Sequence, residues 1–134
     1  MRVCYGQGGR YSHGKYMMNI YAIRGAITVD ANTKEEIETK SIMLMREIVA
    51  KNSISSAISI IISTTDDITA YYPAKAIRES GVLDAPLFSC KEPSIDGALP
   101  LCIRVLVTVV SEKETKPTHV YLGKAQTLRK DLIK

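Results

Sequence analysis

Apolar residues repeat with two different periods along this chain, and the order of the periods limits the folds available to it. Residues 20–29 and 57–64 alternate in hydrophobicity, as strands do when they bury one face. Between them, the apolar residues of 37–49 recur every three or four positions, as on the buried side of a helix. The order predicts a strand, a long helix and a second strand that pack together.

Polar residues mark the ends of the long helix. Asn32, followed three residues later by Glu35, resembles a capping box, and Asn52 marks the helix end. The buried stripe is expected to contain Ile37, Leu44, Met45, Ile48 and Val49. In the second strand, Ile58, Ile60 and Ile62 are expected on one face, with Ser59, Ile61 and Ser63 on the other.

The second half of the chain predicts one short helix and three further strands. Pro73 suits the first position of a helix that ends at Ser80, because Gly81 can terminate it. The strands are expected at 86–90, 101–110 and 119–122. One long and one short helix on one face of a mixed sheet give an α+β domain. The uncovered face is rich in Ile and Val, so we expect a homo-oligomer that buries it.

The first 16 residues differ from the rest of the chain. They hold four of the eight glycines and no periodic apolar pattern, so we interpret 1–16 as a flexible N-terminal extension and 17–134 as a single domain. They also hold three basic residues and no acidic one, which leaves only one of the four net positive charges on the body. Nucleic-acid binding is therefore not expected.

Several functional classes lack the residues that they need. The odd set Cys4, Cys90 and Cys102 matches neither a disulfide framework nor a metal clip, and two histidines are too few for a typical zinc site. No apolar run approaches the ~20 residues of a membrane span, and the N-terminus lacks the apolar core of a secretory signal. We expect a cytoplasmic protein with reduced thiols, no metal, no cofactor and no membrane partner.

Two arginines lie within apolar strands, where a charge is costly to bury. Arg24 and Arg104 each lack a carboxylate two residues away on their own strand face. Each must form a salt bridge across the sheet, reach solvent, or meet the anion of a ligand. Two such arginines on separate strands favour a receptor for carboxylates, which a guanidinium binds through two nitrogens.

Four more side chains have two interpretations each. Glu92 either pairs with one of the arginines or accepts a hydrogen bond from a substrate hydroxyl, and Tyr121 either anchors the core or donates to an anion. Lys75 and Arg78 share one face of the short helix, either as a solvated surface or as the wall of a neighbouring subunit's pocket. A site rich in arginine and without a nucleophile suits a reaction that needs charge stabilisation and positioning.

Five blocks of the sequence resemble the small monofunctional chorismate mutases, the trimeric bacterial type with a mixed sheet. They are IRGAITV (23–29), YPAKAIRE (72–79), GALPLCIRV (97–105), HVYL (119–122) and LRKDL (128–132). The resemblance runs from Ile20 to Leu132. It implies a trimer that packs its sheets into a pseudo-barrel. It also implies the concerted rearrangement of chorismate to prephenate without metal or cofactor, a step of the shikimate pathway toward phenylalanine and tyrosine.

The resemblance also implies residue roles. Arg104 would contact the ether oxygen and a carboxylate, and Arg24 would hold a carboxylate. Glu92 would accept from the ring hydroxyl, and Tyr121 would lie near the side-chain carboxylate. The remaining pocket residues would be Phe88, Ser89, Cys90, Lys91 and Leu128, with Tyr72, Lys75 and Arg78 from the adjacent subunit. The alternative is a non-enzymatic trimer that binds a small anionic metabolite, although such a binder has no need of Glu92.

Overall fold

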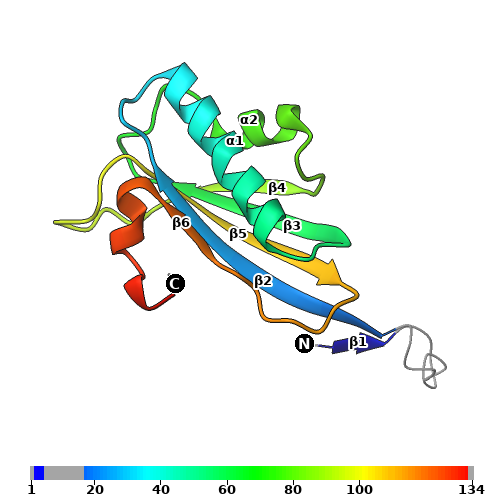
Figure 1. Cartoon of the computed structure of the whole chain (residues 1–134). Coiled ribbons are helices and arrows are strands. Elements are labelled where there is room, and N and C mark those ends of the chain that lie inside the picture. Colours follow the sequence, from blue (N-terminus) through cyan, green and yellow to red (C-terminus); the bar gives the residue numbers. More distant parts are fainter. Residues whose placement is uncertain (1, 5–16, 133–134) are drawn as a thin grey trace.

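The computed structural model describes residues 2–4 and 17–132, and it has two helices over one face of a mixed sheet (Figure 1). The strands are β1 (Arg2–Cys4), β2 (Met17–Thr28), β3 (Ser56–Thr64), β4 (Leu87–Lys91), β5 (Cys102–Ser111) and β6 (Val120–Leu122). The helices are α1 (Lys34–Lys51) and α2 (Pro73–Ser80), and the 3-10 helices η2 (Gly123–Thr127) and η3 (Lys130–Leu132) follow β6. The expected α+β class is confirmed.

The sheet has the order β1-β2-β5-β3-β4, and β6 also pairs with β2. β5 is antiparallel to both of its neighbours, whereas β4 is parallel to β3 and β6 is parallel to β2. β1 belongs to the segment expected to be a flexible extension, yet it pairs antiparallel with residues 17–19. The other residues of that segment, 1 and 5–16, lie outside the described part of the chain.

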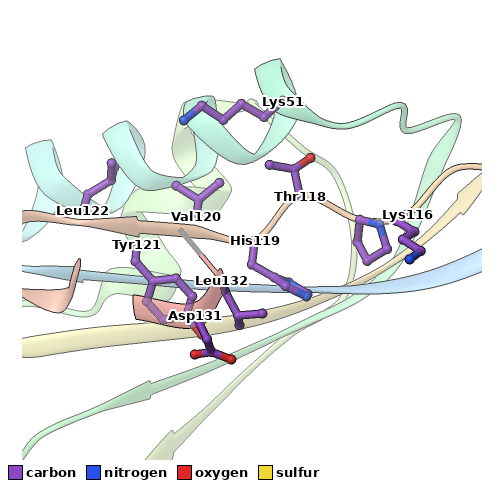
Figure 2. Close-up of a pocket in the computed structure, with 10 residues that line it drawn as sticks. Lys51, Lys116, Thr118, His119, Val120, Tyr121, Leu122, Asp131 and Leu132 are labelled. Atoms are coloured by element: carbon purple, nitrogen blue, oxygen red, sulfur yellow. The ribbon is translucent and has the colours of Figure 1, made fainter. Parts of the chain in front are cut away.

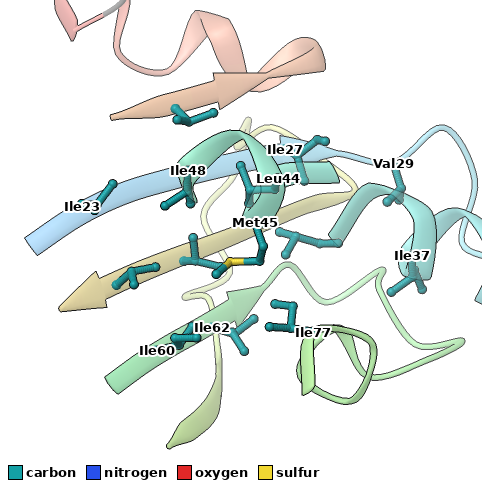
Figure 3. Close-up of a cluster of buried hydrophobic side chains, with 14 of the residues drawn as sticks. Ile23, Ile27, Val29, Ile37, Leu44, Met45, Ile48, Ile60, Ile62 and Ile77 are labelled. Atoms are coloured by element: carbon teal, nitrogen blue, oxygen red, sulfur yellow. The ribbon is translucent and has the colours of Figure 1, made fainter. Parts of the chain in front are cut away.

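The main core lies between α1, α2 and the sheet (Figure 3). Its fully buried side chains come from both helices and from the sheet, and they include Ile23, Ile27, Leu44, Met45, Ile48, Ile60, Ile62, Ile77, Ile103 and Val107. Gly25 lets α1 approach β2 closely, because a Cβ atom there would lie 2.8 Å from Cδ1 of Ile48 and 2.9 Å from Cγ2 of Val105. Since strand side chains alternate, Arg24 and Arg104 face away from this core. We call the side away from α1 and α2 the open face.

The cap of α1 lies one residue later than the sequence predicts. Thr33 is the N-cap, and its Oγ1 accepts a hydrogen bond from the backbone N–H of Glu36. Asn32 instead uses its Oδ1 to accept from the backbone N–H groups of Thr69 and Ala70, each at 3.0 Å. The predicted capping pair of Asn32 and Glu35 was therefore wrong, because the Asn32 side chain accepts hydrogen bonds from a loop distant in sequence.

Two predicted core positions also differ, whereas the short helix agrees with the prediction. A β-bulge between Ala57 and Ser59 leaves Ile58 without a partner on β5 and 44% exposed, so Ile58 does not join the buried face. Val49 is only half-buried. The short helix runs from Pro73 to Ser80, and Gly81 ends it with a φ of 68°. Among the described residues, no helix is long and apolar enough to span a membrane.

Candidate active site

The register of the sheet brings the two strand arginines together on the open face. Arg24 pairs with Leu106 and Arg104 pairs with Ala26, so the two arginines are diagonal neighbours on adjacent strands. Such neighbours lie about 7–8 Å apart, within reach of long side chains. Together they line a hollow of about 250 Å³, which we call the open-face hollow. Its other walls come from Gly25, Ala26, Ile61, Ser63, Cys90, Val105, Leu106 and Tyr121.

Glu92, directly after the end of β4, forms an ion pair with the guanidinium of Arg104 on β5. The backbone N–H of Glu92 donates to the carbonyl of Thr64, which continues the pairing of β4 with β3. Its Oε1 atom lies 3.4 Å from Nε of Arg104 and accepts a hydrogen bond of 2.5 Å from Oγ of Ser63. The Arg104 side chain is 48% exposed, whereas that of Glu92 is 20% exposed. Arg104 therefore forms a salt bridge across the sheet, and its guanidinium also reaches solvent.

Arg24 differs from Arg104, since within the described ranges no carboxylate forms an ion pair with its guanidinium. Its backbone N–H donates to Nδ1 of His119 at 2.9 Å. Burial raises the pKa of the nearby Cys102 thiol above its ordinary value, so this group stays uncharged at neutral pH. The two arginines of the open-face hollow therefore have one carboxylate in an ion pair with them, Glu92 on Arg104, while the Asp131 carboxylate that Arg129 binds is close enough to Arg24 for the charge of Arg24 to help lower its pKa. This charge balance suits an anionic ligand.

Tyr121 serves both as packing and as a pocket wall. It pairs with Ala26 across β2 and β6, and it packs with Leu128 against the small cluster formed by Ala26, Cys102 and Ala125. Its half-buried ring also lines a second pocket of about 510 Å³, between β6 and the C-terminal turns (Figure 2). Tyr121 thus lines the open-face hollow, whereas Leu128 packs beside Ala26 without lining it.

The strand alternation of β4 divides the predicted segment 88–91 between two faces. Phe88 and Cys90 pair with Ile61 and Ser63, which places them on the open face. Ser89 lines a separate pocket of about 490 Å³ with Tyr72, below the start of α2.

The remaining predicted residues lie away from the open-face hollow within one chain. Lys91 forms an ion pair of 3.3 Å with Asp66. Lys75 and Arg78 are exposed on α2, across the sheet from the hollow. One chain therefore does not bring Tyr72, Ser89, Lys75, Lys91 or Arg78 to Arg104.

Two residues at this site had no role in the sequence analysis. Ser63 was placed on the face opposite Ile60 and Ile62, but its bond to Glu92 depends on the pairing of β3 with β4. His119 lies two residues before Tyr121, so strand alternation was the one available signal that both share a face.

The fold and the site together define an α+β protein with a hollow lined by two arginines on one face of a mixed sheet. Residues 20–132 match the family model described as chorismate mutase type I. The chorismate mutase AroH of Bacillus subtilis (strain 168) is 40% identical over 119 residues, which cover 86% of this chain and 94% of the relative. The AroH protein of Thermus thermophilus is 37% identical and covers 84% of this chain and 96% of its own length.

A solved chorismate mutase from Clostridium thermocellum has the same fold, with a TM-score of 0.72 and 37% identity. The match covers 80% of this chain and 98% of that structure. The chain belongs to the type I chorismate mutase family, and it is therefore an isomerase of aromatic amino-acid biosynthesis. The resemblance stated from the sequence blocks is confirmed. The non-enzymatic binder is not favoured.

Proposed function

We propose that the open-face hollow is where this enzyme rearranges chorismate to prephenate. The observation that carries the proposal is the pair of diagonal arginines, of which Arg104 is oriented by Glu92 and Arg24 is without an ion-pair partner among the described residues. Chorismate carries two carboxylates, a ring hydroxyl and an ether oxygen. The two arginines that line the hollow suit the carboxylates and the ether oxygen, and Glu92, which pairs with Arg104, suits the ring hydroxyl.

The enzyme's task in this reaction is to stabilise charge rather than to form a covalent bond with the substrate. The ether C–O bond breaks ahead of C–C bond formation, so negative charge grows on the ether oxygen in the transition state. A fixed guanidinium aimed at this oxygen binds the transition state better than the substrate, and this difference raises the rate. We assign this role to Arg104, and we assign a substrate carboxylate to Arg24.

Glu92 has two roles in this proposal. Its Oε1 atom already joins Ser63 and Arg104, which holds the guanidinium in one orientation. Its other carboxylate oxygen is assigned the ring hydroxyl of the substrate as donor. Tyr121 is assigned the side-chain carboxylate, because it lies at the same hollow as Arg24.

We further propose that the active form is a homotrimer whose subunits complete each other's sites. The open face leaves Ile61, Leu106 and Phe88 exposed by 40%, 38% and 69%. Large exposed apolar side chains on one face are typical of an interface. Tyr72, Lys75 and Arg78 would then reach the hollow from the neighbouring subunit, which accounts for their distance from Arg104 within one chain.

Mixed trimers test this arrangement. Arg104→Ala and Arg78→Ala are each expected to lower activity strongly. If the two residues meet across an interface, refolding the variants together should restore roughly a quarter of the wild-type activity by random assembly in a ring. No recovery from well-folded mixed trimers would contradict the shared site.

The proposed location is the cytoplasm. The thiols of Cys90 and Cys102 are free. Reduced thiols are usual in cytoplasmic proteins and uncommon in secreted ones.

The ultraviolet absorbance of chorismate tests the function itself. The purified protein should consume chorismate and form prephenate without any addition. Binding of chorismate without its consumption would favour a metabolite-binding trimer instead.

A further inference from the structure

We propose that His119 is a positioning residue of this active site, and that its neutral imidazole holds the Arg24 backbone through Nδ1. The inference rests on the proposed function of the open-face hollow. Its geometric basis is the hydrogen bond of 2.9 Å from the backbone N–H of Arg24 to Nδ1 of His119. This bond joins two residues that are 95 positions apart in the chain.

The bond lies where the pairing of two strands stops. β6 pairs with β2 from Gly25 and Val120 onward, so Arg24 is the first β2 residue beyond that ladder. The imidazole gives the Arg24 N–H the acceptor that the ladder no longer supplies. Without the imidazole, this N–H lies past the end of β6 and would donate its hydrogen bond to water instead. We therefore expect a change in the position of Arg24 rather than loss of the fold.

His119 lies on the same face of its strand as Tyr121. His119 and Tyr121 alternate with Val120 along the chain, and both point to the side of Asp131 and Leu132, whereas Val120 points toward α1 (Figure 2). The backbone ladder joins β2 to β6 from Gly25 onward, and the His119 imidazole extends this connection by one residue, to Arg24. The side chains of Arg24 and Tyr121 are the ones assigned to substrate carboxylates, so their spacing affects substrate binding directly.

The contact works in one protonation state only. Nδ1 can accept a hydrogen bond when the ring proton is on Nε2, whereas an imidazolium has donors alone and would repel the N–H of Arg24. Partial burial and the positive charges of Arg24 and Arg129 lower the pKa of His119 below its ordinary value. Neutral His119 is thus the form present near pH 7.

Other charged and titratable groups also face His119 from the elements around it. Those that line its pocket are Lys51 at the end of α1, Lys116 in the preceding connection, Tyr121 on β6 and Asp131 on η3. Asp131 is the one group among them that favours an imidazolium. Its carboxylate is already bound by Arg129 at 2.8 and 3.0 Å, so little of its charge is left for His119.

Two substitutions separate positioning from mere structural support. His119→Asn places an amide oxygen close to the position of Nδ1, so it accepts from Arg24 but does not titrate. His119→Leu fills a similar volume and has no acceptor. We expect the KM of His119→Leu for chorismate to rise roughly tenfold, the effect of losing one well-placed hydrogen bond. His119→Asn should recover most of that loss.

The pH profile provides the second measurement. As the pH falls below the pKa of His119, kcat/KM of the wild type should fall, whereas that of His119→Asn should stay flatter over the same range. Nitrogen-15 NMR of the imidazole adds a readout that needs no activity, and it should show the Nε2–H tautomer at neutral pH. An Nδ1–H tautomer, or pH profiles that coincide for wild type and His119→Asn, would overturn the inference. A wild type that shows this tautomer but consumes no chorismate would overturn the proposed function and leave the His119–Arg24 contact standing.

Discussion

Arg104 and Glu92 form an ion pair in which Nε and Oε1 lie 3.4 Å apart, and Ser63 donates to the same oxygen. One carboxylate therefore connects the end of β4 with side chains from β3 and β5. The Arg104 side chain is 48% exposed, so this is not a fully buried salt bridge whose loss would unfold the protein. Its structural effect is to orient the guanidinium toward the open-face hollow.

The first prediction concerns Arg104. Arg104→Ala should lower kcat by about 10²–10³ or more, because it removes the donor aimed at the ether oxygen. Arg104→Lys should recover only part of this loss, since an ammonium lacks the planar fork. Stability should change by about 1 kcal/mol or less, as for other partly exposed ion pairs. Turnover and thermal unfolding are measured on the same samples, with Arg46→Ala on the exposed side of α1 as the control. Normal turnover in folded Arg104→Ala would refute the catalytic role.

Ser63→Ala tests whether Glu92 must be held in place. The variant loses one of the two contacts of the Glu92 oxygen, so we expect kcat to fall roughly tenfold while the unfolding free energy changes by about 1 kcal/mol. Ser59→Ala is the matched control, because it changes the same residue type on the same face of β3. Equal kinetics for the two variants would show that the Ser63 hydroxyl has no part in the reaction.

Gly25→Ala tests the close approach of α1 to β2. The added Cβ would lie 2.8 Å from Cδ1 of Ile48 and 2.9 Å from Cγ2 of Val105, so overpacking should cost about 1–3 kcal/mol of stability. Ile48→Val removes one of the two clashing atoms. In the wild type this substitution typically costs about 0.5–1.5 kcal/mol of stability, and in the Gly25→Ala background it should cost less because it also relieves the clash. Urea unfolding of all four proteins at one protein concentration measures this coupling, and additive losses would contradict the steric explanation.

The lowered pKa of His119 predicts how stability depends on pH. Below about pH 6.5 the unfolded chain binds a proton at this residue that the folded chain does not bind. The free energy of unfolding should therefore decrease as the pH falls from 6.5 to the folded pKa, and this contribution should then level off. His119→Asn lacks this titrating group. As the pH falls, the stability of His119→Asn relative to the wild type should therefore rise, which urea titrations from about pH 8 to about pH 5 can measure. A constant difference between the two proteins would contradict the shift.

Local patterns were sufficient for most of the secondary structure. The alternation in 57–64 and the three-to-four spacing in 37–49 depend on neighbours in sequence, so strand and helix followed from them. Pro73 and Gly81 marked the ends of α2 because each has a backbone preference of its own. The five sequence blocks likewise identified the family before any geometry was known.

Contacts between distant residues decided what the sequence left open. Asn32 could cap its own helix or bind the loop at Thr69. The loop lies next to Asn32 in the fold, so the side chain binds the loop. Arg104 could have paired with any acid, and the placement of β4 beside β3 selected Glu92. Periodicity reports which face a side chain takes, but the register between strands determines which side chains meet there, and no neighbour in sequence encodes that register.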